Sequence, residues 1–445
     1  MSSLLAPYRQ SLQRCELTRT VGHVRQLGGL TVEVEGLRAS VGDLFTILAS
    51  AASAASLDTR VLAEVVAVKA DSLLLMPYGS LHGLSAGCEV ISADTQTTIG
   101  VGDALLGRVI DGFGTPLDGK PAAQLPHRRA LRASPCNPMT RPRISERLDS
   151  GVRVIDSLLT LGKGQRMGIF AGSGVGKSTL LGMIARHVKA DVNVIALIGE
   201  RGREVRDFIE LQLGPDGLAR SVVVVAASDQ PALSRLRAAN AALAIAEHFR
   251  DLGKQVLLTM DSVTRFAMAR REVGLAAGEP PTARGYTPSV FAELPQLCER
   301  CGTAASGGSI TALMTVLVEG DDMNEPVSDN MRAILDGHIV LSRQLAHSGQ
   351  YPAIDVLQSA SRVMADVVPP QQLQLASQAL RTVAMLERNR QLVDIGAYEA
   401  GSNAALDQAL AIKEPLHAWM RQREGGVPCG DGLNQLAKVL SGSVA

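Results

Sequence analysis

Hydrophobic and polar residues follow a different pattern in each part of the chain. From about residue 17 to 93, short runs such as LTVEVEGL and VLAEVVAV alternate apolar and polar residues and are separated by glycines. A period of two with glycine breaks is typical of short antiparallel strands, so residues 18–95 are predicted to form a small β-barrel or sandwich. Residues 1–17 carry Leu4, Leu5, Tyr8 and Leu12 at helical spacing and are predicted to form a short helix.

The central part alternates strongly apolar runs with helical stretches. It follows a Gly/Pro-rich passage and a connector rich in proline and arginine that ends near Pro142. The predicted strands are residues 167–170, 192–199, 221–227, 256–261 and 310–318. Strands that are apolar on both faces, with helices between them, indicate a buried and mainly parallel sheet. We therefore predict an α/β domain over residues 96–367.

No strand pattern is visible after about residue 367. The runs LQLASQALRTVAMLERNRQLVDIG and NAALDQALAIKEPLHAWMRQ have helical periodicity and are followed by a glycine-rich tail. Residues 368–445 are therefore predicted to form a helical domain. The expected order is a β domain, an α/β core and a helical cap.

Composition narrows the classes of function. The 445 residues are enough for about three domains, and 46% of them are hydrophobic. Lys plus Arg (44) equals Asp plus Glu (44) and aromatics are only 3%, which argues against nucleic acid as a partner. Arg9 and Arg14 lie where a signal peptide would need its apolar core, and no early run is apolar enough to span a membrane. We expect a cytoplasmic protein.

The six cysteines are scattered through the chain and do not form a secreted disulfide framework. Cys298 and Cys301 make one C-x-x-C pair. A zinc site would need a second pair of ligands at suitable spacing, which the sequence does not offer. Packing thiols on one helix face are therefore favoured over a metal or redox site.

The strongest chemical signal is AGSGVGKS at residues 171–178, between a predicted strand and a predicted helix. A glycine loop between a strand and a helix can direct backbone N–H groups at phosphate oxygens. This context favours a phosphate-binding loop over a chance glycine turn. Lys177 is expected to reach the β- and γ-phosphates of ATP, and the Ser178 hydroxyl to bind Mg²⁺. The predicted nucleotide-binding residues are Gly172, Ser173, Gly174, Val175, Gly176, Lys177, Ser178 and Thr179.

Two carboxylates follow other predicted strands. Asp261 ends QVLLTMD and is the candidate Mg²⁺ partner, while Glu200 follows VNVIALIG and is the candidate group that orients the attacking water. Ligands of open α/β sheets bind at the carboxyl ends of the strands, which favours both assignments. The alternative for Glu200 is a surface ion pair with Arg201 or Arg203.

Taken together, these motifs resemble a known family. AGSGVGKS, ALIGERGREVRDFIE, LTMDSVTRFAMARREVGLAAGEPP and the decapeptide PAIDVLQSAS are similar to those of rotary-type ATPase catalytic subunits. The match is nearest to the type III secretion ATPases, above all the flagellar export ATPase, and is dense over residues 107–364. This resemblance implies a RecA-like P-loop core.

The resemblance also implies roles for individual residues. It assigns Lys177 and Glu200 to catalysis and Ser178 and Asp261 to Mg²⁺. Tyr351 matches an aromatic that packs on adenine, and Arg362 matches an arginine that reaches the nucleotide of the adjacent subunit. Because one chain holds both the glutamate and the finger arginine, identical copies can supply both, and a homohexamer is expected.

Partners are expected from the family alone. They are a stator-like regulator at residues 1–17, a central stalk protein, export chaperone–substrate complexes and a membrane export gate approached from the cytoplasmic face. The expected function is ATP hydrolysis in flagellar protein export. An injectisome ATPase, an ATP synthase catalytic subunit and a hexameric RNA translocase are the alternatives. The last would need exposed aromatics, and residues 17–93 contain only Phe45 and Tyr78.

Overall fold

A computed structural model describes residues 20–48, 60–93, 97–318, 320 and 322–442. The chain divides into two compact units. The first comprises the described residues up to Thr97 together with Glu272–Pro280, and the second comprises Thr98–Arg271 and the described residues from Pro281 onward. The helix predicted for residues 1–17 lies outside the described residues.

The first unit is built on a closed six-stranded barrel with the order β1-β2-β5-β4-β3-β6, all pairs antiparallel. Val32 and Val34 of β2 are buried in its core, and the intervening Glu33 is not, as the period of two requires. The predicted small barrel is confirmed. Its strands are β1 (Val21–Gly28), β2 (Thr31–Glu35), β3 (Leu44–Leu48), β4 (Arg60–Val68), β5 (Leu73–Pro77) and β6 (Glu89–Ser92).

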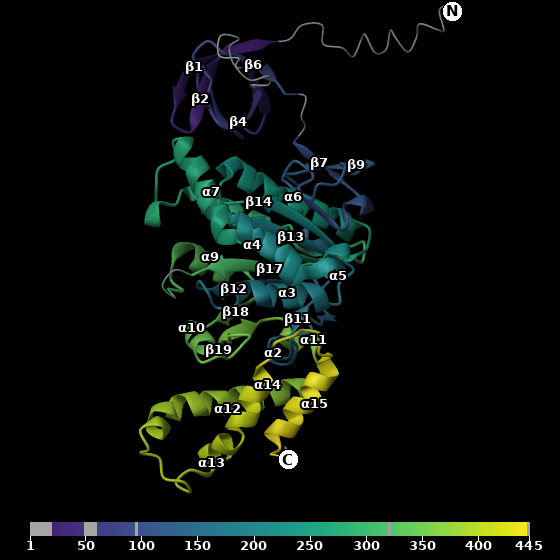
Figure 1. Ribbon diagram of the computed structural model, residues 1–445, viewed down its shortest axis with the longest axis vertical. Helices are drawn as coiled ribbons and strands as arrows, with labels where there is room; N and C mark the ends of the chain where they lie inside the picture. Colours follow the sequence, from purple (N-terminus) through teal and green to yellow (C-terminus); the bar gives the residue numbers. More distant parts are fainter. Residues whose placement is uncertain (1–19, 49–59, 94–96, 319, 321, 443–445) are drawn as a thin grey trace, which may run out of the picture. The chain divides into compact units, whose positions relative to one another are not determined.

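The second unit contains the predicted α/β core (Figure 1). Its sheet runs β19-β18-β12-β17-β15-β13-β14-β8, with β16 attached to β17. The strands from β18 to β8 are parallel, and β19 joins the edge antiparallel. The five predicted strands are found as β12 (Arg166–Ala171), β13 (Val192–Ile198), β14 (Ser221–Ala226), β15 (Gln255–Asp261) and β17 (Ser309–Leu317).

Further strands were not predicted because they are short or partly exposed. Half of the eight residues of β19 are polar and three are exposed, and β8 has three residues. They are β8 (Arg108–Ile110), β16 (Gly302–Thr303), β18 (Gly337–Leu341) and β19 (Ile354–Ser361), together with two small ribbons, β7 (Thr98–Val101) with β9 (His127–Ala130) and β10 (Arg147–Leu148) with β11 (Leu161–Gly162).

Helices pack along this sheet. The longest, α6 (Ala232–Asp251), is rich in alanine, so its backbone lies close to β13, β14 and β15 and most of its residues are buried. The remaining helices before α12 are α2 (Arg153–Leu158), α3 (Lys177–His187), α4 (Gly202–Asp207), the π-helix η4 (Phe208–Leu213), α5 (Gly214–Ala219), α7 (Val263–Ala276), α8 (Pro288–Glu299), α9 (Pro326–Ile334), α10 (Arg343–His347) and α11 (Met364–Val367), with short 3₁₀ turns η2 (Asp103–Leu105), η3 (Pro138–Thr140) and η5 (Ala283–Gly285).

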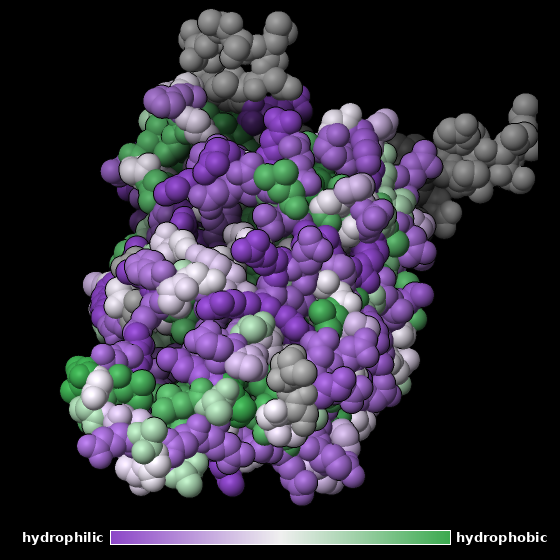
Figure 2. Space-filling model, turned by 60° about the horizontal axis from the view of Figure 1, so that its bottom comes forward, coloured by the Kyte–Doolittle hydropathy of each residue, from purple (hydrophilic) through white to green (hydrophobic). Residues whose placement is uncertain are grey.

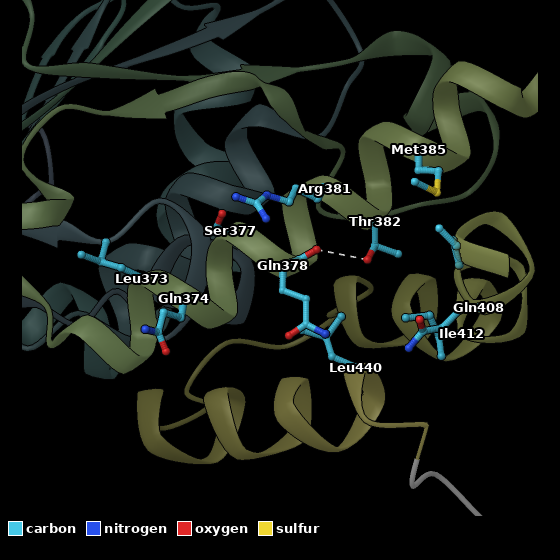
Figure 3. A pocket seen from close by; sticks show the side chains of 12 residues that line it. Leu373, Gln374, Ser377, Gln378, Arg381, Thr382, Met385, Gln408, Ile412 and Leu440 are labelled. Atoms are coloured by element: carbon cyan, nitrogen blue, oxygen red, sulfur yellow. Dashed lines mark hydrogen bonds between the residues drawn. The ribbon is translucent and has the colours of Figure 1, made fainter. Parts of the chain in front are cut away.

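After β19 the described chain is helical, as predicted. The helices are α12 (Pro370–Asp394), α13 (Ala404–Ala411), α14 (Lys413–Met420) and α15 (Cys429–Leu440). Thus part of the glycine-rich stretch predicted as a tail forms α15 instead. Side chains from α12, α13 and Leu440 of α15 line a cavity of about 540 Å³ (Figure 3).

Hydrophilic side chains cover most of the face seen in Figure 2, with hydrophobic residues between them. The exposed large hydrophobic residues include Leu392 in the last turn of α12 and Ile395 just after it. Within the described ranges, no helix combines the length and the apolar character that a membrane span needs.

Candidate active site

The glycine loop joins β12 to α3. Gly174 and Gly176 have φ angles of 77° and 84°, a left-handed conformation that favours glycine. Ala171, the first position of the motif, is the last residue of β12 and pairs with Leu317 and Leu341 inside the sheet. Alanine is suitable there because this position is ordinary strand backbone. Ser178, in the first turn of α3, is exposed at the loop.

Three predicted residues meet beside this loop. The Lys177 ammonium group donates a hydrogen bond to Oδ1 of Asp261, and its Nζ lies 3.5 Å from Oε1 of Glu200. Their side chains are 13%, 4% and 12% exposed, respectively, so the cluster is largely withdrawn from solvent. A cation is therefore balanced by two acids in a shielded site.

The parallel register explains why these residues meet. Leu197 of β13 pairs with Asp261 at the end of β15, and the preceding residue of β15, Met260, pairs with Met314 of β17. β17 in turn pairs with β12. All these strands end at the same edge of the sheet. Glu200 follows β13, Asp261 ends β15 and Lys177 follows β12, so their side chains converge as the sequence predicted.

The electrostatics of the cluster follow from burial and charge. Burial alone would lower the pKa of Lys177, but the charges of Asp261 and Glu200 raise it more, so the net pKa is raised and the lysine stays protonated. Burial raises the pKa of Glu200, helped by the charge of Asp261 and opposed by that of Lys177. Arg201 and Arg203 pair with Glu204 and Asp207 instead, so the alternative surface ion pair for Glu200 is not observed.

Two supporting residues were not predicted. The Oγ1 hydroxyl of Thr315, on β17, donates to Oδ1 of Asp261 at 2.8 Å and is fully buried. Arg265, on α7, donates to the Gly199 carbonyl at 2.9 Å, and its charge lowers the pKa of Glu200. A hydroxyl within the apolar run ITALMTVLV was the only sequence signal for Thr315; Arg265 follows DSVT with no signal of its own.

Tyr351 lies against the glycine loop. A Cβ atom placed on Gly176 would stand 3.2 Å from both Cδ1 and Cε1 of the tyrosine ring, tighter than ordinary van der Waals contact. The tyrosine is 42% exposed, so part of the ring remains open to a ligand. The structure thus brings Tyr351 next to Gly176, from the segment just before β19.

Arg362 lies at the opposite end of the same strand. Ile354 of β19 pairs with Leu341, which is level with Ala171, whereas Ser361 pairs with Gly337 at the amino end of β18. The length of β12, about 16 Å at roughly 3.3 Å per residue, therefore separates Arg362 from the start of the glycine loop. Arg362 is exposed and its guanidinium donates to the Arg332 carbonyl at 3.3 Å. It does not join the Lys177 cluster of its own chain.

Cys298 and Cys301 lie at the end of α8 with both thiols free and buried. Burial raises the pKa of Cys301 to about 12, and raises that of Cys298 still further. Such thiols stay protonated and unreactive at neutral pH. Across the residues that the structure describes, no group of three or more His, Cys, Asp or Glu is arranged to hold a metal ion.

A glycine loop between strand and helix, a lysine in the first helical turn and acids at the ends of adjacent parallel strands define a class of protein, the P-loop nucleoside triphosphatases. Residues 151–361 match the ATP synthase alpha/beta family, nucleotide-binding domain. Residues 368–437 match the C-terminal domain of the type III secretion ATPase EscN.

Individual relatives agree over nearly the full chain. The flagellum-specific ATP synthase of Bacillus subtilis (strain 168) is 53% identical over 93% of this chain and 94% of its own. The type 3 secretion system ATPase of Xanthomonas euvesicatoria is 51% identical over 91% and 90%. The structure of the assembled ATPase EscN from enteropathogenic E. coli aligns with a TM-score of 0.88 and 44% identity, covering 94% of this chain and all of that one.

The chain belongs to the ATP synthase alpha/beta family, in its group of flagellum-specific and type III secretion ATPases. The predicted family, P-loop fold and ATPase class are thereby confirmed. The roles of individual residues remain predictions, which the geometry above makes testable.

Proposed function

We propose that this chain is the ATPase of a flagellar protein export apparatus and works as a homohexamer. The relatives named flagellum-specific ATP synthase, including those of Bacillus subtilis and Treponema pallidum (strain Nichols), support the flagellar assignment. The Lys177–Asp261–Glu200 cluster carries the proposal, because it supplies a phosphate-binding cation and two acids at one sheet edge. An injectisome ATPase is the second candidate, favoured by the Xanthomonas relative and by EscN.

ATP is proposed to bind with its phosphates in the loop of residues 172–179. The charge of Lys177 would then face the β- and γ-phosphates, and the adenine would lie against the open part of the Tyr351 ring. The Ser178 hydroxyl and the Asp261 carboxylate are hard oxygen donors beside Lys177, a set that suits Mg²⁺. When bound, the ion neutralises charge that develops on the phosphate oxygens.

Glu200 is the proposed group that orients the attacking water and accepts its proton. Its position after β13, with Oε1 3.5 Å from Nζ of Lys177, supports this role. The raised pKa supports this role, because a buried carboxylate is a stronger base than an exposed one.

Arg362 is proposed to act on the nucleotide of a neighbouring copy. Within one chain it lies at the far end of β19 from the loop, while exposure leaves its guanidinium available for a neighbour. Two copies placed head to tail would bring this arginine to the next chain's phosphates, and repetition closes a ring. The assembled form of EscN supports a ring for this chain.

The remaining partners are proposed from the family. A central stalk protein is supported by the structure of EscN with its central stalk EscO. A stator-like regulator at residues 1–17, chaperone–substrate complexes and the membrane export gate are further proposed partners. With these partners, the chain is proposed to lie in the cytoplasm and to associate peripherally with the membrane.

The test of the proposed activity is Lys177→Ala beside Lys189→Ala. Lys189 follows α3, pairs with Asp149 and is 71% exposed, so it is a matched lysine outside the site. We expect Lys177→Ala to abolish ATP hydrolysis in a phosphate-release assay and Lys189→Ala to retain it. Sustained hydrolysis by the Lys177 variant would remove the phosphate-site assignment.

A further inference from the structure

The connection between α14 and α15, residues 421–428, touches the segment that carries Tyr351. The backbone N–H of Gln422 donates to the Tyr351 carbonyl at 2.8 Å. Nε2 of Gln350, the residue before Tyr351, lies 3.9 Å from Sδ of Met420, the last residue of α14. The C-terminal helices therefore hold, through direct contacts, the tyrosine that lies against Gly176.

The side chain of Gln422 fixes this connection in one place. Its Nε2 donates to the carbonyls of Gly151 at 2.9 Å and Glu424 at 2.8 Å, and its Oε1 accepts from the backbone N–H of Arg153 at 2.9 Å. Both ends of the amide are thus bonded, and the residue is 6% exposed. A buried amide with these partners holds its own backbone in register with α2 and with Tyr351.

The same connection also meets the far end of the phosphate-loop helix. His187 ends α3, and its ring packs against Gly425 and Gly426 while its Cβ lies next to Gly151. A Cβ on Gly426 would stand 2.8 Å from Nδ1 of His187, and one on Gly151 would stand 2.7 Å from Cβ of His187, so larger residues do not fit. Residues 421–428 therefore contact both Tyr351 and the helix that begins with Lys177.

We infer that Gln422 is a positioning residue for nucleotide binding, which acts by holding Tyr351 over the glycine loop. The inference rests on the proposed role of Tyr351 against adenine. Gln422 anchors its own backbone to Gly151 and Arg153, and that backbone anchors Tyr351. A shift of residues 421–428 would therefore displace Tyr351 and change the affinity for the nucleobase.

The test compares Gln422→Met, Tyr351→Ala and Gln372→Met in the full-length chain. Gln372 is the matched control, because it is also buried and its Nε2 donates to the Asp156 carbonyl and to Oγ1 of Thr160, joining α12 to α2 without touching Tyr351. Affinities for ATP and for inorganic tripolyphosphate, each with Mg²⁺, are measured by calorimetry, together with KM and kcat for ATP.

We expect Gln422→Met and Tyr351→Ala each to weaken ATP binding about three- to tenfold, the range of a lost aromatic contact, with tripolyphosphate affinity unchanged. KM should rise while kcat changes little. The double variant should bind ATP no more weakly than Tyr351→Ala alone, since both act on one contact. Gln422→Glu, which keeps the acceptor for Arg153 but loses both donors, should shift ATP affinity in the same direction.

Each other outcome overturns the inference. If Gln372→Met weakens ATP binding as much as Gln422→Met does, loosening the C-terminal helices at any point would have this effect. If Gln422→Met also loses tripolyphosphate affinity, the phosphate loop itself would be disturbed. If Tyr351→Ala weakens ATP binding but Gln422→Met does not, the tyrosine role stands and the positioning role falls. If Tyr351→Ala has no effect, both fall, while the Lys177 test still judges the phosphate site.

Discussion

The two ends of the parallel sheet differ in how complete they are within one chain. At the carboxyl end, Lys177, Glu200 and Asp261 balance one another in a shielded cluster. At the amino end, Arg362 is exposed, and its guanidinium donates to the Arg332 backbone carbonyl. The carboxyl end therefore has the features of an assembled site. The amino end presents an exposed arginine that is open to a ligand from another copy.

This difference shows how a single strand can serve two sites. β19 follows Tyr351 at the carboxyl end and precedes Arg362 at the amino end, so its length keeps the two residues apart. The proposed finger role of Arg362 therefore requires a nucleotide that is held by another copy of the chain. If Arg362 has this role, hydrolysis depends on assembly.

The largest expected effect comes from Arg362→Ala. Loss of an arginine finger reduces turnover by about 10³- to 10⁵-fold, because charge on the transferred phosphoryl group is no longer neutralised. Glu200→Gln should also stop hydrolysis, by about 10²- to 10⁴-fold, while still binding ATP. Mixing the two inactive proteins should restore part of the activity, because some interfaces between neighbouring copies then contain both an intact Glu200 and an intact Arg362. Phosphate release is measured over a range of mixing ratios.

Arg332→Ala is the control for this mixing experiment. Its guanidinium is paired with Asp329 in the same chain, and its carbonyl accepts from Arg362. Arg332 is therefore a neighbouring, partly exposed arginine with a partner of its own. It should keep most of the activity. Mixtures that stay inactive at every ratio would show that Arg362 does not act on a neighbouring copy. Equal losses of activity in Arg362→Ala and Arg332→Ala would indicate that the interface between copies is disrupted.

A smaller effect is expected from two buried threonines on β17. Thr315 bonds Asp261 at the carboxyl end, and Oγ1 of Thr311 accepts from the Gly164 N–H at 2.8 Å at the amino end. Thr315→Val should lower kcat about tenfold, since losing a hydrogen bond to a charged group removes about 1.5 kcal/mol of positioning energy. Thr311→Val should lower the melting temperature but leave kcat nearly unchanged.

The two threonine variants separate positioning from packing, because both replace a buried hydroxyl on the same strand. Steady-state kinetics and thermal unfolding of each variant provide the comparison. If Thr311→Val lowers kcat as much as Thr315→Val, the carboxyl end has no special dependence on its hydrogen bond, and Thr315 is a structural residue only.

The carboxyl end was largely predictable from sequence because its signals are local. The glycine loop and the acids that follow apolar strands lie within short segments, and parallel strands bring such segments to one edge. The amino end was not predictable in this way. β19 is polar at half of its positions and partly exposed, so its pattern does not indicate a strand. Arg362 entered only through the resemblance of PAIDVLQSAS.

Contacts between segments that are far apart along the chain could not be predicted from the sequence. Gln422 and Tyr351 are far apart along the chain, and nothing near either residue indicates that the backbone of one bonds the other. The cysteine pair illustrates the opposite case. Cys298 and Cys301 have a spacing that suggests metal or redox chemistry, but burial makes both thiols poor nucleophiles and poor ligands.

The smallest expected effect is a shift in pH dependence, and it tests the electrostatics of the carboxyl end directly. The proposed role of Glu200 as the base requires its ionised form, and burial raises its pKa above the ordinary value of 4.5. On acidification, kcat/KM should therefore fall through a midpoint above that value, because this ratio reports ionisation of the free enzyme. The charge of Arg265 lowers the pKa of Glu200, so Arg265→Ala should move the midpoint to higher pH.

Arg206→Ala is the control, because Arg206 is exposed and paired with Glu210 four residues on. This variant should not move the midpoint. A midpoint that is the same in Arg265→Ala and wild type would show that another group controls the acid limb, and Glu200 would lose its assignment as the base.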